Sequence, residues 1–453
     1  MRELMKNGMD VARFNFSHSD HSVHKARFET VCKLREELGV NIATLLDTKG
    51  PEVRLKNFKD HKPVTIKDGD TFTLTTREVE GDETICSITF PQLPKDVSVG
   101  TRILINDGNI ELKALRVDNT DIVCEVIHGG VVSDHKGINV PDVNLSMPYI
   151  SDADMADLEF GAKMGFDYIA ASFVRTGADV IYLRKFTQSL GWFNPRIIAK
   201  IENAQGVANI DEILDAADGI MVARGDMGVE IPFEQIPAIQ KELIRKAYNA
   251  GKNVITATQM LESMITNARP TRAEITDVAN AIYDGSSAIM LSGETAAGKY
   301  PVEAVKTMSL IAETTEKDID YISRFKKRAD ERNSSITDAI SHATVTTAHD
   351  LNAVAILTVT KGGTTARTLS KFRPNCPIIA LTTDDTTYHQ LSLSWGIRAG
   401  VIEEKTNTDE LIRHALERSV ELGYLKKGDL VVITAGVPLG MSGTTNLLKV
   451  ERA

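Results

Sequence analysis

Short apolar runs alternate, along most of the chain, with stretches whose apolar residues recur at helical spacing. Apolar runs bounded by polar residues predict buried strands of a parallel sheet, and the stretches between them predict covering helices. One helix is expected over 153–164, because a Ser151-Asp152 start precedes it. Strands are expected at 11–16, 41–46, 166–172, 196–201, 219–223, 253–258 and 287–291. The alternation favours an α/β fold.

Two other segments break this pattern. Residues 51–137 contain alternating strands and the turns Asp68-Gly69 and Asp107-Gly108, which predict an all-β domain inserted into a barrel loop. Its strands are expected at 63–66, 71–75, 102–105 and 122–126. The charged segment 324–332 predicts a solvated helix or linker, and a third α/β alternation follows it. Its strands are expected at 354–358, 378–381, 401–403, 430–434 and 446–450. The chain thus divides into a barrel (1–50 and 138–325), a lid (51–137) and a C-terminal α/β domain (333–453).

The first region has one strand fewer than a closed barrel. A TIM-type (β/α)8 barrel needs eight strands, and residues 1–8 resemble the end of the helix that follows the first of them. We therefore expect a barrel whose first strand is missing from this sequence, and a native protein that is longer. An open barrel leaves two strand edges unpaired, which favours misfolding.

Composition and charge exclude several classes of protein, namely nucleic-acid-binding, disulfide-rich and membrane proteins. The chain has 453 residues, of which 42% are hydrophobic and 25% charged, as in a soluble globular protein of about three domains. Its net charge of -10 argues against a nucleic-acid partner, because phosphate backbones are bound by excess Lys and Arg. The four cysteines lack CxxC spacing, which disfavours zinc and disulfides and indicates a reducing cytoplasm. No signal peptide or membrane-length apolar run is present, so we expect a cytoplasmic protein with no membrane partner.

Charged and polar residues close the central strands of the predicted barrel. Active sites of such barrels lie at the C-terminal ends of the strands. Lys200 and Glu202 close one strand, Gly225 and Asp226 follow the next, and Thr258 follows a third. Two carboxylates can hold Mg²⁺ or Mn²⁺ and leave positions for substrate oxygens. Any one of these residues alone is more often a surface charge or an ion pair, but together they favour an enzyme of a small phosphorylated anion.

Two further features extend this rim. The backbone N–H groups at Gly225 and Asp226 could face a substrate carboxylate, with support from the dipole of a helix after Pro232. On the early strands, Arg13 suits a phosphate clamp because its guanidinium binds two oxygens at once. Asn15, Ser17 and Asp47 supply oxygen ligands of the kind that a monovalent cation accepts, although each alone is equally explained as a strand-end hydrogen bond.

Several motifs resemble pyruvate kinase, and the match spans nearly the whole chain. They are VARFNFSH at 11–18, DTKGPEVR at 47–54, IAKIEN at 198–203, VARGD at 222–226, ATQMLES at 257–263 and IMLSGET at 289–295. The inserted β domain and the C-terminal α/β domain follow in the family's order. The resemblance implies transfer of a phosphoryl group from phosphoenolpyruvate to ADP, which gives pyruvate and ATP in the last step of glycolysis.

The resemblance also implies roles for the rim residues. Glu202 and Asp226 are expected to hold the divalent metal, Lys200 to neutralise charge on the phosphoryl group in a loose transition state, and Arg13 to clamp the phosphate. The pyruvate portion of the substrate is expected to lie against Gly225, Asp226 and Thr258, and Thr258 and Ser292 are candidates for relaying the proton. The sequence does not settle the proton donor.

A potassium site and a nucleotide site are implied in the same way. The potassium ligands are expected to be Asn15, Ser17, Asp47 and Thr48. Glu52 supports this assignment, because family members that dispense with potassium carry a lysine at its position. His18, Arg54 and Lys136 match nucleotide-contacting positions, and the last two belong to the lid, whose closure would exclude water from the phosphoryl group.

The third domain contains a candidate phosphate loop between a strand and a helix expected to open at Ala366. Backbone N–H groups and hydroxyls in such a loop can cradle a phosphate, but a simple strand–turn–helix connection explains it equally well. The family places a sugar-phosphate effector here, under a loop at 436–443, with fructose 1,6-bisphosphate as a candidate. The residues implied are Thr360, Lys361, Gly363, Thr364 and Thr365. The family also implies a homotetramer. Because the sequence ends at Ala453, we expect no extra C-terminal domain of the kind that some bacterial relatives carry.

Two other functions remain open from the sequence. A metal-dependent phosphoenolpyruvate or pyruvate lyase would use the same carboxylates but would need neither the lid, nor Lys136, nor the potassium ligands. A catalytically impaired or regulatory relative would follow from the missing first strand. An assay for pyruvate formation from phosphoenolpyruvate and ADP separates the three.

Overall fold

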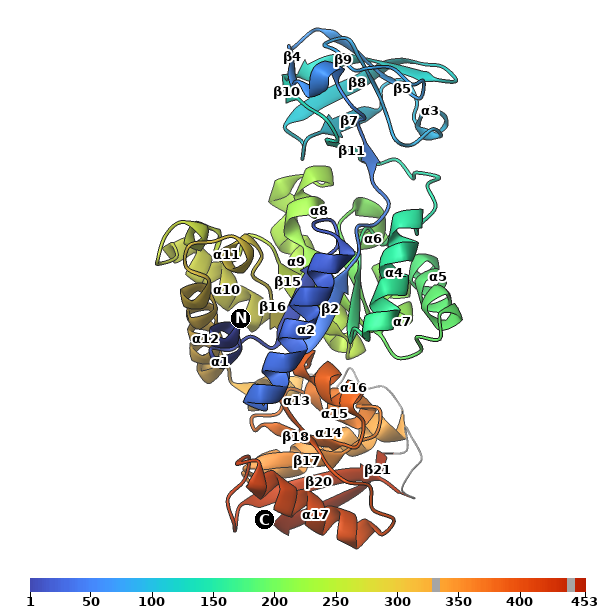
Figure 1. Cartoon of the computed structure of the whole chain (residues 1–453). Helices are drawn as coiled ribbons and strands as arrows, with labels where there is room; N and C mark the ends of the chain where they lie inside the picture. Colours follow the sequence, from blue (N-terminus) through green and yellow to red (C-terminus); the bar gives the residue numbers. More distant parts are fainter. Residues whose placement is uncertain (328–334, 438–444) are drawn as a thin grey trace.

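The chain forms three regions in a row, with the inserted lid at one end, a β/α barrel in the middle and a C-terminal α/β unit at the other end (Figure 1). The computed structural model describes residues 1–327, 335–437 and 445–453. No helix in these ranges is long and apolar enough to cross a membrane.

The barrel sheet is parallel and has the strand order β1-β2-β12-β13-β14-β15-β16. Its strands are β1 (Val11–Asn15), β2 (Ala43–Asp47), β12 (Tyr168–Ala171), β13 (Arg196–Ile201), β14 (Gly219–Ala223), β15 (Asn253–Ala257) and β16 (Ala288–Ile289). The predicted number of strands in this region is therefore confirmed, although β16 is shorter than expected. Among the described residues, β1 and β16 are the two edges of the sheet and do not pair with each other.

The strands read as continuous apolar runs because both of their faces are buried. In β2, Leu45 packs against residues of the other strands inside the barrel, whereas Leu46 packs against Phe28 and Phe166 on the outside. A parallel sheet covered on both faces needs apolar residues at every position, and not the alternation of a half-exposed strand. The apolar run thus shows that the strand is buried, and the pleat decides which residues face the interior.

Helices cover the outer face of the sheet (Figure 1). The longer helices of this region are α2 (His21–Leu38), α4 (Asp152–Met164), α5 (Gly177–Ser189), α9 (Ile236–Ala250), α10 (Arg272–Asp284) and α12 (Pro301–Asp318). The shorter ones are α1 (Arg2–Lys6), α6 (Ala204–Ala208), α7 (Ile210–Ala216), α8 (Arg224–Glu230) and α11 (Gly293–Ala296). The predicted start of α4 is confirmed, because the Ser151 hydroxyl accepts a hydrogen bond from the N–H of Asp154 and the Asp154 carboxylate accepts one from the N–H of Ser151.

The lid is all-β, as predicted. Its main sheet has the order β3-β11-β7-β8-β9-β5-β6, and β4 and β10 form a small second sheet. The strands are β3 (Val53–Arg54), β4 (Val64–Ile66), β5 (Thr71–Thr75), β6 (Ile85–Ser87), β7 (Arg102–Ile105), β8 (Ile110–Val117), β9 (Asp121–His128), β10 (Gly130–Val132) and β11 (Gly137–Asn139), with a short helix α3 (Leu93–Asp96). Asn106, Asp107 and Gly108 all have positive φ, so the predicted Asp-Gly turn is the tight turn that joins β7 to β8.

The C-terminal unit has one five-stranded sheet with the order β19-β18-β17-β20-β21, in which only β21 is antiparallel. Its strands are β17 (Ala355–Val359), β18 (Ile378–Thr382), β19 (Ile397–Val401), β20 (Leu430–Gly436) and β21 (Thr445–Arg452). Its helices are α13 (Tyr321–Lys327), α14 (Ile336–Asp350), α15 (Thr364–Lys371), α16 (Asp385–Gln390) and α17 (Thr408–Glu421). Of the charged segment 324–332, residues 324–327 lie in α13 and the rest fall outside the described residues.

One strand of this sheet was predicted in the wrong place. The expected strand at 401–403 shares only Val401 with β19. The position of β19 is set by its pairing with β18, in which Ile378 lies opposite Ile397 and Thr382 lies opposite Val401. Because β19 is an edge strand, it accommodates the exposed Arg398, a polar residue that hid the strand in the sequence.

The C-terminal unit packs against the N-terminal ends of the barrel strands. The Arg373 guanidinium donates to the backbone oxygen of Gly285 at 3.1 Å, just before β16. The Gln390 amide donates to the backbone oxygen of Asp167 at 3.1 Å, just before β12. The opposite end of the barrel, where the strands finish, faces the lid (Figure 1).

Candidate active site

The Lys200 ammonium lies at the centre of the site, where β2, β12 and β13 end. It donates to Ser172 Oγ at 2.7 Å and lies 3.1 Å from Asp47 Oδ1 and 2.9 Å from Glu202 Oε1. An ammonium has three N–H donors, and these three oxygens lie within 3.1 Å of it. The Lys200 side chain is 11% exposed and both carboxylates are 1% exposed, so these charges are largely removed from water.

The pleat of the strands explains why these side chains meet. Side chains two residues apart on a strand point to the same face. Asp47, Ser172 and Lys200 each follow, by two residues, an apolar residue inside the barrel, namely Leu45, Ala170 and Ile198. The strand register places Ala170 opposite Asp47 and Ala171 opposite Ala199. Parallel pairing therefore brings the polar residues together at the height where the apolar interior ends.

The two carboxylates beside Lys200 are in different electrostatic states. Burial raises the pKa of Glu202 to about 7, and the charge of Asp226 adds to the rise, while Lys200 opposes it. Burial also raises the pKa of Asp47, but Lys200 and Arg13 together lower it by more, so its net shift is downward. Burial lowers the pKa of Lys200, and Asp47 and Glu202 more than reverse that change. Asp47 is thus the stable anion of the pair, and Glu202 is poised to exchange a proton for another cation.

Glu202 has the properties expected of a divalent-metal ligand. Its Oε2 accepts from the N–H of Phe173 at 2.6 Å. Its Oε1 makes an ion pair with Lys200 but no aligned hydrogen bond in the described part of the chain, although it is buried. Asp226, in the first turn of α8, supplies an exposed second carboxylate. No group of three or more His, Cys, Asp or Glu gathers in the described ranges. Two carboxylates fit Mg²⁺, which usually keeps several positions for water and substrate oxygens.

The residues predicted to bind a monovalent cation lie at the neighbouring ends of β1 and β2. Asn15 is opposite Asp47 in the strand register, and its Oδ1 accepts from the N–H of Ser17 at 3.0 Å. The backbone oxygen of Thr48 accepts from Ser172 Oγ at 2.6 Å. Arg13 Nε donates to Asp47 Oδ2 at 2.5 Å. These neutral oxygens around one buried carboxylate fit a weakly charged cation, and Arg13 stands at their edge.

Thr258 and the Gly225 backbone, both predicted to hold the pyruvate portion of the substrate, are in contact with each other. The N–H of Gly225 donates to Thr258 Oγ1 at 2.9 Å. The helix at this strand end is α8, which begins directly after β14 at Arg224. The helix expected after Pro232 is preceded by a short 3₁₀ turn (Phe233–Gln235) and begins at Ile236, so the residues at its start are not those of the rim. The first turn of α8 therefore lies where the start of the later helix was expected.

Ser292 precedes α11, and a buried carboxylate fixes its position. Glu294 accepts from the N–H of Ser292 at 2.8 Å and from the N–H of Leu261 at 3.1 Å. It is 1% exposed and joins the loops that follow β15 and β16. In the described part of the chain no hydrogen bond joins the Ser292 hydroxyl to Thr258, so its relay role remains a prediction.

The three residues matched to nucleotide contacts lie in two places. Arg54 donates to Glu52 Oε2 at 2.7 and 2.8 Å and to the backbone oxygen of His135 at 2.8 Å. Lys136 is its neighbour across the paired strands β3 and β11, because the N–H of Leu55 donates to the Lys136 backbone oxygen. His18 instead follows β1 on the barrel. The two lid residues thus form one group at the barrel end of the lid.

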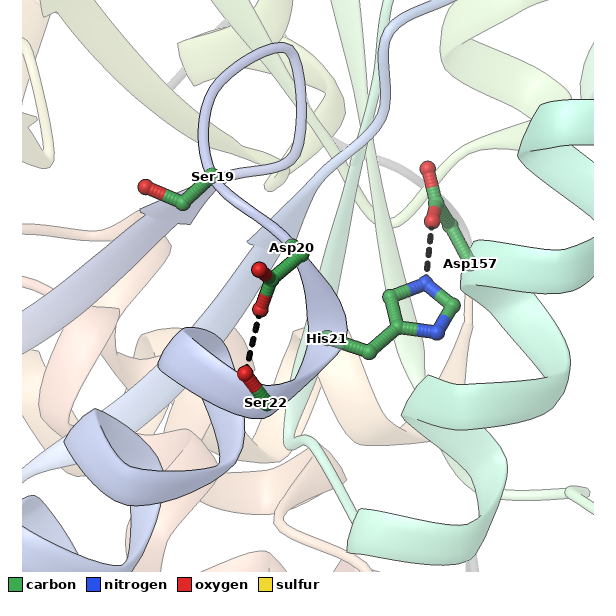
Figure 2. A pocket seen from close by; sticks show the side chains of 5 residues that line it. All are labelled: Ser19, Asp20, His21, Ser22 and Asp157. Carbon is green, nitrogen blue, oxygen red and sulfur yellow. Dashed lines mark hydrogen bonds and ion pairs between the residues drawn. The ribbon is translucent and has the colours of Figure 1, made fainter.

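A surface hollow of about 520 Å³ is lined by residues that start with Ser19, directly after His18. Ser19, Asp20, His21, Ser22 and Asp157 line it (Figure 2). His21 Nε2 lies 2.6 Å from Asp157 Oδ1, which ties α2 to α4 across the hollow (Figure 2). None of the five residues belongs to the group around Lys200.

The candidate phosphate loop follows β17, and its helix begins at Thr364, two residues before the predicted Ala366. Gly363 precedes the helix with φ 76°, a backbone conformation that favours glycine. Thr360 and Thr365 are buried, and Lys361 and Thr364 are exposed. Thr365 Oγ1 lies 2.7 Å from Thr445 Oγ1 on β21. Most of the loop at 436–443 that was expected to close over an effector lies outside the described residues.

Two residues of the site were not assigned a role from the sequence. Ser172 closes the predicted strand 166–172, so the rule that located Lys200 could also have found it. Arg224 sits inside the VARGD motif, and its contacts with the turn after β15 become visible only in the folded chain. Its partners are 33 and 34 residues away in sequence, and no local pattern marks them.

Comparison with known proteins agrees with this geometry. The family model for "Pyruvate kinase, barrel domain" matches residues 1–305, and that for "Pyruvate kinase, alpha/beta domain" matches residues 338–451. A pyruvate kinase of Clostridium acetobutylicum is 48% identical over 449 residues, which cover 99% of this chain and 95% of that protein. One of Geobacillus stearothermophilus is 49% identical over 451 residues, which cover 99% of this chain and 77% of that protein.

A solved structure supports the same relationship. The crystal structure of a pyruvate kinase from Cryptosporidium parvum superimposes with a TM-score of 0.93 at 39% identity, and the match covers all of this chain and 92% of that one. Two family models that together span most of the chain, and relatives nearly half identical over its full length, leave one assignment: the chain belongs to the pyruvate kinase family.

Proposed function

We propose that this chain transfers the phosphoryl group of phosphoenolpyruvate to ADP through the group centred on Lys200. The observation that carries the proposal is a buried ammonium between Asp47 and Glu202, at the strand ends that face the lid. A preorganised charge in a water-poor site stabilises developing charge far more than the same charge does in water. Phosphoryl transfer depends mainly on such positioning and charge stabilisation.

The residues around the ammonium bind different parts of the substrate. Lys200 neutralises charge on the phosphoryl oxygens, and Arg13, one strand from Asp47, binds the phosphate. The carboxylate and enolate oxygens of the substrate lie against the backbone of Gly225 and Asp226 and beside the Thr258 hydroxyl. Thr258 and Ser292 remain the candidates that pass a proton to the enolate.

Two cations complete the proposed site. Glu202 and Asp226 hold Mg²⁺ or Mn²⁺, which supplies a Lewis acid for the substrate oxygens. The raised pKa of Glu202 supports this role, because a metal can replace the proton that burial favours. Asn15, Ser17, Asp47 and Thr48 hold K⁺, and Glu52 supports this assignment, because family members that dispense with potassium carry a lysine at its position.

The lid supplies the nucleotide side of the reaction. Arg54 and Lys136 bind ADP from the lid, and His18 does so from the barrel. A contact between Asn139, the last residue of β11, and Glu230 of α8, at 3.3 Å, joins the sheet of the lid to the barrel rim. Closure of the lid over the nucleotide excludes water and so prevents hydrolysis of the phosphoryl group.

The remaining parts of the proposal concern regulation and organisation. A sugar phosphate such as fructose 1,6-bisphosphate binds at Thr360, Lys361, Gly363, Thr364 and Thr365. The protein is a cytoplasmic homotetramer, and its chain divides into a barrel (1–50 and 138–325), a lid (51–137) and a regulatory domain (333–453). Saturation curves of the activity that do not change when candidate sugar phosphates are added would contradict the proposed activation by a sugar phosphate.

The test is a coupled assay of pyruvate formation with Mg²⁺ and K⁺ supplied and then withheld. We expect turnover that needs ADP and both cations. Lys200→Met should lower kcat by about 10²- to 10³-fold, the loss seen when one preorganised charge is removed. Pyruvate formation without ADP would indicate a lyase, and unchanged turnover of Lys200→Met would refute the central role of this lysine.

A further inference from the structure

The turn that carries Thr258 has a strained backbone. Thr258 has φ 68° and the next residue, Gln259, has φ 53°. This left-handed region is unfavourable for residues with a Cβ, and most of all for a β-branched residue such as threonine. Strain of this kind persists only where surrounding contacts fix the backbone, and it concentrates at functional sites. Contacts from outside the turn must therefore hold Thr258 in place.

Arg224 makes those contacts from the neighbouring strand end. Its Nε donates to the backbone oxygen of Ala257 at 3.1 Å, and its Nη2 donates to the backbone oxygen of Thr258 at 2.5 Å. The guanidinium thus binds the peptide oxygens on both sides of the strained Thr258. A planar fork with fixed donors suits this task, whereas a lysine ammonium offers only a point charge.

The arginine is itself held in position. Its Nη1 donates to both oxygens of Asp277 on α10, each at 2.7 Å, and lies 3.4 Å from Gln240 Oε1 on α9. The Arg224 side chain is 13% exposed. A buried guanidinium with a fixed carboxylate partner has little freedom, so its contacts with the turn are preorganised.

The residue after Arg224 fixes the side chain of the same threonine. The N–H of Gly225 donates to Thr258 Oγ1 at 2.9 Å, and Thr258 Oγ1 donates to the backbone oxygen of Ala257 at 2.7 Å. Arg224 and Gly225 together therefore determine the backbone and the hydroxyl direction of Thr258.

We propose that Arg224, supported by Asp277, is a positioning residue for the reaction, which holds Thr258 in its left-handed conformation so that the hydroxyl faces the enolate. The proposal rests on the proposed function, in which Thr258 lies beside the substrate. In this proposal Arg224 acts through Thr258 and not by contact with the substrate or the metal.

The test compares Arg224→Met and Asp277→Asn with a matched control, Arg35→Met. Arg35 is also a buried arginine, 14% exposed, that donates to a backbone oxygen, that of Ile42, and pairs with a carboxylate, Asp167. It lies at the opposite end of the barrel. We expect Arg224→Met to lower kcat about 10²-fold, the loss that a displacement of about 1 Å at a reacting group produces, with a small change in the KM for ADP. Arg35→Met should lower the melting temperature with kcat within about twofold of wild type.

A rescue separates positioning from general stability. Gln259→Gly removes the Cβ from the second left-handed residue, so the turn needs less support from Arg224. In the Arg224→Met background, Gln259→Gly should raise kcat about fivefold or more. The conformational free energy that a left-handed residue with a Cβ costs corresponds to a change of about that size in an equilibrium constant. Crystal structures should show Thr258 φ shifted out of the left-handed region in Arg224→Met and returned to it in the double variant. Arg224→Lys provides a second variant should Arg224→Met fail to fold.

Three outcomes would overturn the proposal. The first is an Arg224→Met enzyme whose kcat falls no more than that of Arg35→Met. The second is a structure of Arg224→Met in which Thr258 keeps its conformation while kcat falls. The third is Thr258→Ala with wild-type kcat, since Thr258 would then have no part in the reaction. A wild-type protein without any turnover would instead reject the proposed function itself.

Discussion

Replacing Glu202 by glutamine should stabilise the metal-free protein while it abolishes most of the activity. Glu202 is 1% exposed, and burial raises its pKa from 4.5 to about 7. Each unit of difference between folded and unfolded pKa corresponds to about 1.4 kcal/mol, so the shift is equivalent to roughly 3 kcal/mol. Glutamine has the shape of the neutral acid and does not carry this energetic penalty.

The sign of the effect sets its pH dependence. The folded protein binds the proton of Glu202 more tightly than the unfolded chain does. This tighter proton binding stabilises the folded protein fully below about pH 4.5, and the stabilisation is lost as the pH rises through 7. Above pH 7, without metal, Glu202→Gln should be more stable than wild type by roughly 3 kcal/mol, and near pH 5 by less than about 1 kcal/mol. Mg²⁺ should narrow or reverse the difference, because only the wild type keeps both carboxylates for the ion.

Thermal unfolding in EDTA between pH 5 and pH 8.5 measures this difference. A change of 3 kcal/mol should move the melting temperature of a barrel of this size by roughly 6 to 12 °C. Glu29→Gln is the control, because Glu29 is 61% exposed on α2 and its loss should have no comparable pH-dependent effect. A stability difference between Glu202→Gln and wild type that does not change with pH would refute the reasoning, as would a wild type that is the more stable at pH 8 in EDTA.

Two further predictions concern single contacts. Ser172→Ala removes the uncharged partner of the Lys200 ammonium among the described residues. Cations bound at Asp47 and Glu202 would weaken the other two contacts of this ammonium, so kcat should fall about tenfold. Ser172→Thr should restore part of that loss, and Ser419→Ala, a buried serine of α17, should leave kcat unchanged. Gly363→Ala would place a Cβ 2.6 Å from the Arg367 guanidinium and should abolish activation by fructose 1,6-bisphosphate. Gly428→Ala carries similar backbone strain without a clash and should keep the activation, so loss in both variants would contradict this reading of the loop.

The strand ends of the barrel show how far local pattern reaches. Lys200 and Glu202 could be assigned from the sequence, because an apolar run that ends in charged residues indicates a strand that leaves the barrel interior at a fixed point. Parallel pairing then brings such ends together whatever the loops do. The same rule placed Asp47 and Thr258 at the rim.

Contacts between elements that are distant in the sequence could not be predicted from the strand ends. Glu294 joins the loops after β15 and β16, and the partners of Arg224 in the turn after β15 are separated from it by more than 30 residues. Their geometry depends on loop conformations and on the packing of α10, which no periodicity encodes. The misplaced strand at 401–403 has the same origin, because β19 takes its position from β18 and not from its own apolar residues.

The sequence by itself therefore determined the architecture, the family resemblance and the residue types at the rim of the barrel. These features follow from short-range periodicity and from motifs that lie within a few residues. Only the tertiary structure decided which side chain each of them meets: that Lys200 contacts Ser172 as well as two carboxylates, that burial leaves Glu202 close to protonation at neutral pH, and that Arg224 holds Thr258 in a strained turn. Desolvation and hydrogen-bond geometry arise from the packing of the whole barrel, and the pattern of residues along the sequence does not predict either of them.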